Sequence, residues 1–214
     1  MKPMKMLLWM PLLAITLLLA PAHAQTTPSE PPATSAPAAE PAPLPAGPKA
    51  MAERPDQSSL PDTVSITGRP ALIVSGDGLW EGGYEMLRTI FQRLDAAATK
   101  AGLKKTGYPI AIFRETTDTG FVFDAMIPID STPTATPADF PPELKFGSTP
   151  SGAAVRFIFQ ASYDEIEGAY EQITAYLDAK SINVEDAFIE EYITLGAQSD
   201  DPATDINIYV KPKP

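Results

Sequence analysis

Cysteine is absent from the chain, and histidine occurs only once, as His23. His23 lies in an N-terminal stretch that we expect to be removed, so the mature protein should contain neither residue type. A Ser-His-Asp triad, a cysteine nucleophile, a zinc site built on His or Cys and a haem held by histidine are therefore excluded. We expect no metal and no cofactor.

Long apolar runs are also missing, except for one at the N-terminus, Met6–Ala20. Lys2 and Lys5 precede it, and the small-x-small pattern Ala22-His23-Ala24 follows it, which predicts a signal peptide over residues 1–24. The mature protein should then be periplasmic or secreted, with no membrane span. An uncleaved N-terminal anchor is the alternative.

Basic residues are few. The chain has 16 Lys and Arg against 27 Asp and Glu, and losing the two lysines of the signal leaves 14 against 27, a net charge of −13. Such acidity repels nucleic acid and anionic lipid and favours cationic partners. We expect no nucleic-acid partner.

The composition changes twice along the mature chain. Residues 25–62 are rich in Pro, Ala, Ser and Thr and lack apolar periodicity, which predicts a disordered linker. Residues 63–214 are long enough for one domain with its own core. Because the chain has no disulfide, an exported domain must depend on that core for its stability.

Within this domain the order strand–helix–strand–strand occurs twice. The first half has expected strands at 71–75, 108–115 and 121–129, and a helix with the apolar face Tyr84, Leu87, Phe91, Leu94 and Ala98. The second half has expected strands at 154–160, 187–195 and 205–211, and a helix with the apolar face Tyr163, Ile166, Tyr170, Ile173 and Leu177. Ser162 and Glu165 form a capping-box pattern before the second helix.

A shift of 79 residues places one apolar face on the other, which indicates an internal duplication. Two such halves predict an α+β fold with a single antiparallel sheet. We expect both helices on one face of this sheet, leaving the other face as a ligand cleft.

Side-chain alternation in the last two expected strands suggests where a ligand could bind. In the earlier strand Phe188, Glu190 and Tyr192 share one face, and most of the other face is aliphatic. In the later strand Tyr209 lies opposite three aliphatic residues. We expect the two non-aliphatic faces to line the cleft together, with Glu190 as the anionic anchor and the three aromatic residues as its walls.

Aromatic side chains around a carboxylate suit a hydrophobic or cationic ligand. Glu191 interrupts the aliphatic face, so a glutamate that is merely solvated is the alternative interpretation of this strand. Trp80, just ahead of the first helix, is a candidate lid over the ligand or a core anchor.

Three segments carry a family resemblance: Ser162–Tyr170, Phe188–Ile193 and Asp205–Val210, with Phe121–Pro128 as a weaker match in the first half. They resemble the GyrI-like small-molecule-binding domains, also known as AraC-type effector-binding domains, of the SOUL-like superfold. The resemblance implies that Glu190 meets the cationic group of a ligand. Gln160 and Ser162 replace the usual His or Gly before the second helix, and no DNA-binding helix-turn-helix is visible.

The function expected from these features is extracytoplasmic small-molecule binding. One alternative is a small-molecule hydrolase in which Glu190 acts as general base, although an enzyme is the less favoured interpretation. The other is a non-catalytic interaction module of the cell envelope.

Overall fold

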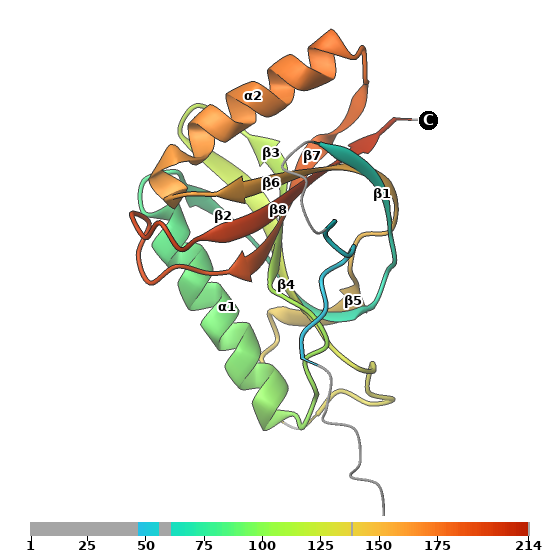
Figure 1. The fold of residues 1–214 in the computed structure, drawn as a ribbon. Helices are drawn as coiled ribbons and strands as arrows, with labels where there is room; N and C mark the ends of the chain where they lie inside the picture. Colours follow the sequence, from blue (N-terminus) through green and yellow to red (C-terminus); the bar gives the residue numbers. More distant parts are fainter. Residues whose placement is uncertain (1–46, 56–60, 138, 214) are drawn as a thin grey trace, which may run out of the picture. The chain divides into compact units, whose positions relative to one another are not determined.

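A computed structural model describes residues 47–55, 61–137 and 139–213 (Figure 1). The expected signal peptide and most of the expected linker lie outside these residues. The described elements are β1 (Asp62–Ile66), β2 (Pro70–Leu79), α1 (Gly83–Lys100), β3 (Ile110–Thr116), β4 (Gly120–Pro128), β5 (Leu144–Ser148), β6 (Gly152–Gln160), the 3₁₀ turn Tyr163–Glu165, α2 (Ile166–Ala179), β7 (Val184–Thr194) and β8 (Asp205–Pro212).

All eight strands join one antiparallel sheet in the order β1-β6-β8-β7-β3-β4-β2-β5. The trio β6-β8-β7 mirrors the trio β2-β4-β3, and β7 pairs with β3 at the centre. The repeated strand–helix–strand–strand order and the α+β class are therefore confirmed. Sequence reasoning missed the two edge strands, because each has only five residues and few apolar ones. Each edge strand pairs with the first strand of the other half, β1 with β6 and β5 with β2.

Helix α1 follows its apolar pattern closely. Tyr84, Leu87, Phe91, Leu94 and Ala98 are all buried, as their spacing predicts. The helix ends at the expected glycine, Gly102, whose φ of 70° is left-handed, and the next amide N–H donates to the carbonyl of Ala98 over 2.9 Å.

Helix α2 departs from the expected start. Ser162 makes no capping bond, and its hydroxyl instead lies 3.3 Å from the carbonyl of Ser199. The predicted capping box is therefore wrong, because a 3₁₀ turn over Tyr163–Glu165 precedes the helix. Only Ile173 and Leu177 of the helix are fully buried. The tyrosines of the predicted apolar face thus remain available for other contacts.

Both helices pack on the same face of the sheet, which we call the helix face. Their buried side chains form one core cluster with alternate residues of β8, namely Ile206, Ile208 and Val210. A smaller apolar cluster lies on the opposite, second face and includes Met51 (blue segment in Figure 1). Residues 47–55 fall within the stretch that we expected to be linker, yet they pack against the domain. No helix in the described ranges has the length and apolarity needed to cross a membrane.

Candidate functional site

The centre of the helix face carries a buried carboxylate. Glu190 lies on β7, paired with Ala111 of β3 on one side and with Ile208 of β8 on the other. Its neighbours on the same face are Phe188 and Tyr192, as strand alternation predicts. Glu190 is fully buried, and none of the ion pairs found among the described residues includes it.

Three tyrosine hydroxyls surround this carboxylate. Tyr170 of α2 donates a short hydrogen bond to Oε1, and Tyr192 of β7 donates another to Oε2. Tyr163, in the turn before α2, donates to Oε2 over 3.2 Å. The ring of Tyr170 also meets the ring of Phe188 edge-on, with 4.9 Å between centroids. Glu190 therefore sits in a cage of aromatic rings and hydroxyl donors.

Burial sets the electrostatics of this cage. Desolvation raises the pKa of Glu190 above its ordinary value of 4.5, and the three tyrosine hydrogen bonds act in the opposite direction. Desolvation, followed by the nearby charge of Glu190, raises the pKa of each of the three tyrosines well above 10. The tyrosines are therefore neutral donors, and no cationic side chain of the described residues forms an ion pair with the carboxylate.

The raised pKa of Glu190 predicts a pH effect on stability. Above pH 4.5 the folded state keeps a proton on Glu190 that the unfolded chain has released, so the free energy of unfolding should fall as pH rises towards the folded pKa. The pKa of Glu191 is also raised by burial and contributes with the same sign. Urea unfolding of wild type and Glu190→Gln from pH 4.5 to neutral pH should show a shallower decline in the variant. Identical slopes would contradict a raised pKa at Glu190.

A cavity of about 1060 Å³ opens beside the cage. It lies between the start of α1, the loop after β3 and one side of α2. Its aromatic lining residues are Trp80, Tyr84, Phe113, Tyr163, Tyr170 and Phe188. Its acidic lining residues are Glu85, Asp118, Asp164, Glu167, Glu171 and Asp178, and no Lys or Arg from the described part of the chain lines it. The volume is at the upper end of the range for small-molecule sites.

Tyr163 and Tyr170 connect the cavity to the buried carboxylate. Both line the cavity, and both donate a hydrogen bond to Glu190, which lies behind them and does not itself line the cavity. Sequence reasoning assigned these two tyrosines to the core only. Their position on the core-facing side of a helix, with a hydroxyl that needs a buried partner, is the signal that could have identified them.

The position of the cavity differs from the expected one. We expected the cleft on the face of the sheet opposite the helices, but the cavity lies on the helix face. Helix α1 contacts β2 and β4, whereas α2 contacts β6. The cavity forms between the two helices, where Phe113 and Thr116 of β3 and Phe188 of β7 line it. The second face is filled by its own apolar cluster and by the segment around Met51.

Tyr209 lies on the wrong side of the sheet for the predicted site. The register pairs it with Ile189, so both face away from the helices, and its hydroxyl donates to Glu191 over 2.8 Å. The expectation that Tyr209 and Glu190 share a face was wrong. In β8 the aliphatic residues face the helices, whereas in β7 the aromatic and acidic residues do so, and only the register reveals that offset.

Trp80 lies at the rim of the cavity, and the residue is 43% exposed. The indole N–H donates to the carbonyl of Thr117 over 2.8 Å, and the ring centroid is 4.6 Å from that of Phe121. The structure thus brings Trp80, Phe188, Tyr192 and Glu190 to one side of the sheet, and Trp80 is held there by the loop after β3.

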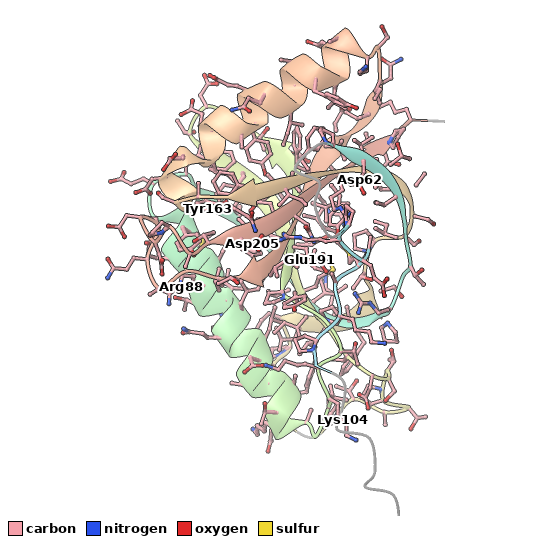
Figure 2. The ribbon with its side chains drawn as sticks, viewed as in Figure 1. Asp62, Arg88, Lys104, Tyr163, Glu191 and Asp205 are labelled. Atoms are coloured by element: carbon pink, nitrogen blue, oxygen red, sulfur yellow. The ribbon has the colours of Figure 1, made fainter. Side chains whose placement is uncertain are left out.

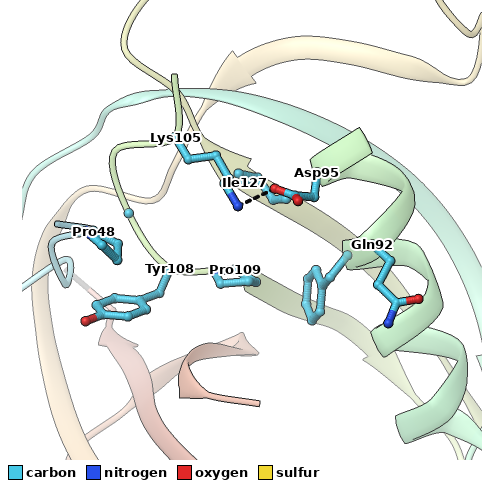
Figure 3. Close-up of a pocket in the computed structure, with 9 residues that line it drawn as sticks. Pro48, Gln92, Asp95, Lys105, Tyr108, Pro109 and Ile127 are labelled. Atoms are coloured by element: carbon cyan, nitrogen blue, oxygen red, sulfur yellow. Dashed lines mark ion pairs between the residues drawn. The ribbon is translucent and has the colours of Figure 1, made fainter. Parts of the chain in front are cut away.

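A second hollow of about 400 Å³ lies farther along α1 (Figure 3). Pro48, Tyr108 and Pro109 line one part of it, and the ion pair between Lys105 and Asp95 lies at its edge. Its acidic side chain already has a cationic partner, and Glu190 and its tyrosines are not among its lining residues. The larger cavity is therefore the candidate site. Among the residues that the structure describes, no group of three His, Cys, Asp or Glu side chains is placed to hold a metal ion.

Comparison with known proteins shows similarity in structure only. No protein-family model matches the chain, and no curated protein matches it in sequence. The DNA complex of EcmrR superposes with a TM-score of 0.57 at 16% identity, covering 72% of this chain. The chain spans only 58% of the length of EcmrR, but 97% of its separate C-terminal domain, with a TM-score of 0.56 at 15% identity.

Two proteins from Listeria innocua are also similar. An uncharacterized conserved protein has a TM-score of 0.54 at 12% identity, covering 74% of this chain and 94% of its own. A protein described as a hydrolase has a TM-score of 0.52 at 11% identity, covering 72% and 92%. These neighbours share the fold of the present domain.

Proposed function

We propose that this chain is an extracytoplasmic small-molecule-binding protein whose ligand is a hydrophobic organic cation. One observation carries the proposal. Glu190 is a fully buried carboxylate without a cationic partner among the described residues, held by three tyrosines beside a large aromatic cavity. The GyrI-like fold, which is that of ligand-binding effector domains, supports the same function.

The physical argument concerns the missing counter-charge. Ionising a buried carboxylate costs free energy unless a cation or strong donors compensate it. Three neutral hydroxyls compensate only in part, because burial still raises the pKa of Glu190. A ligand cation would complete the compensation, and aromatic rings attract cations through their faces. Tyr163 and Tyr170 separate the cavity from Glu190, so direct contact with the carboxylate requires one of them to rotate.

The acidic lining favours the same ligand class. Six carboxylate residues line the cavity and none of the lining residues is basic, so a cation is attracted towards it and an anion is repelled. The extracytoplasmic location is supported by the N-terminal pattern of the sequence alone. A fusion of residues 1–46 to a reporter that is active only outside the cytoplasm tests the location, and a cytoplasmic reporter signal would overturn it.

Charge selectivity is the direct test of the ligand class. Tetraphenylphosphonium and tetraphenylborate have nearly the same shape and opposite charge. The cation is expected to raise the melting temperature of the mature chain and the anion to leave it unchanged, because only a ligand that prefers the folded state stabilises it. Isothermal titration with both ions measures the affinities. Equal binding of the two ions would contradict a role for the carboxylates.

The hydrolase alternative has one observation in its favour. Burial raises the pKa of Glu190 towards the range of a general base, and a Listeria innocua protein of similar fold is described as a hydrolase. However, Glu190 lies behind Tyr163 and Tyr170 and does not line the cavity, so a water molecule in the cavity does not reach it directly. Binding is therefore the better-supported function. If the protein hydrolysed epoxides or activated esters and Glu190→Gln abolished this activity, the hydrolase would become the better-supported function.

A further inference from the structure

The second face of the sheet holds a segment that comes from outside the repeated halves. We call residues 47–55 the strap. In Figure 2, Glu191 is labelled on β7, Asp205 on β8 and Asp62 on β1. These strands, β7, β8 and β1, belong to one side of the sheet together with β6. The strap carries a single fully buried apolar side chain, Met51, which is 6% exposed.

The domain recognises the main chain of the strap. Arg69 Nη1 donates a hydrogen bond to the carbonyl of Lys49 over 3.0 Å. Arg156 Nη1 donates to the carbonyls of Ala52, over 3.0 Å, and Glu53, over 2.9 Å. Glu191 Oε1 accepts from the backbone N–H of Met51 over 2.7 Å. Arg156 and Glu191 are both fully buried. Contacts of this kind do not depend on which side chains the bound segment carries.

Two strap side chains provide selectivity. Met51 packs in the second-face cluster with residues such as Ile66 and Ile110. Arg54 donates to both carboxylate oxygens of Asp205, over 2.8 and 2.5 Å, and to the side-chain oxygen of Asn207 over 2.7 Å. A large apolar residue followed three positions later by arginine therefore fits this face.

Glu191 and its neighbours are organised for such a segment. Asn207 and Tyr209 donate to Glu191 Oε2, over 2.9 and 2.8 Å, which leaves Oε1 to accept from the strap. The carboxylate is thus held in place by the sheet, with one oxygen directed at a peptide N–H. Arg156 is fixed in the same way, since Asp62 accepts from its Nε and Nη2 while Nη1 is directed at the two carbonyls.

We propose that the second face is a peptide-binding site, which the strap occupies within its own chain. Its ligand class is a short peptide segment with a large apolar residue and an arginine three positions later. The site is distinct from the Glu190 cavity, because Glu191 points to the opposite face of β7. The inference goes beyond small-molecule binding and does not depend on it.

Competition between a free peptide and the strap tests this proposal. Met51→Ser with Arg54→Ser in the full mature chain removes both selective contacts of the strap and leaves the face intact. A fluorescent peptide of residues 46–56 should bind this variant at least about tenfold more tightly than wild type, because a tethered strap competes at high effective concentration. The same peptide with both serine substitutions is the matched control and should bind neither protein.

Two results would overturn the proposal. One is a folded variant, verified by circular dichroism, that does not bind the wild-type peptide. The other comes from hydrogen exchange of the wild-type chain, which remains informative if the variant fails to fold. The N–H of Met51 should exchange through local opening, faster than the N–H of Ile208 in β8. Exchange of both only by global unfolding would show that the strap is an inseparable part of the fold.

Discussion

Glu190→Gln is expected to lower the affinity for tetraphenylphosphonium by about 30-fold or more, equivalent to about 2 kcal/mol. The substitution keeps the shape of the side chain and removes the fully buried carboxyl group of the helix face. Gln can still accept from a tyrosine hydroxyl, so the cage should remain. Isothermal titration of the two proteins at neutral pH measures the change.

Stability distinguishes a binding role from a structural one. Because burial raises the pKa of Glu190, its ionised form does not favour folding at neutral pH, and glutamine should leave the free energy of unfolding equal or higher. Glu191→Gln is the matched control, since Glu191 is the next residue, is equally buried and faces the other side of the sheet. It should retain cation affinity. Equal losses in both variants would show that binding does not involve Glu190 directly.

The architecture could be predicted largely from sequence because the two signals that carry it are local. The helix of the first half has five apolar residues three or four positions apart, and all five are buried. The strands have alternation or apolar runs, and their order repeats. The edge strands β1 and β5 were missed because their stability comes from pairing with β6 and β2, which is a tertiary property.

The site could be predicted only in part, for a related reason. Alternation places Phe188, Glu190 and Tyr192 on one face, and the structure confirms this arrangement. Alternation does not determine which side chains of β7 and β8 lie on the same face of the sheet, because that depends on the register between the strands. Tyr209 was therefore placed beside Glu190 when it lies beside Glu191. The cavity lies on the helix face because it forms between the start of α1 and one side of α2, and the spacing of these two helices is a tertiary property.

The segment around Met51 shows the limit of composition. Its surroundings are rich in Pro and Ala, which is typical of a disordered linker, and the nine described residues bury only one large apolar side chain. Their contacts depend on charged residues far along the chain, such as Arg156 and Glu191. The composition of a segment does not include the distant residues that bind it. A segment held by such polar partners can therefore have the same composition as a disordered spacer.

Arg156→Met is expected to lower the free energy of unfolding by about 3 kcal/mol. Arg156 is fully buried, and its guanidinium donates to the carboxylate of Asp62 over 3.0 and 2.7 Å and to two strap carbonyls. Methionine fills similar volume but leaves these acceptors without their donor. Because the Asp62 side chain is 33% exposed, water can solvate part of what is lost, which holds the effect at the lower end for buried ion pairs. Urea unfolding at neutral pH measures it.

Arg114→Met is the control variant for the loss of stability expected in Arg156→Met. Arg114 also pairs with an aspartate, Asp124 on the neighbouring strand, but its side chain is 54% exposed. The Asp124 side chain is 14% exposed but keeps the Ser75 hydroxyl as a donor. A pair whose cation is in solvent contributes about 0–1 kcal/mol, so this variant should be nearly as stable as wild type. A large loss in Arg156→Met alone would establish that β1 and the strap are anchored through one buried guanidinium. Equal small losses would mean that the edge of the sheet and the strap hold without it.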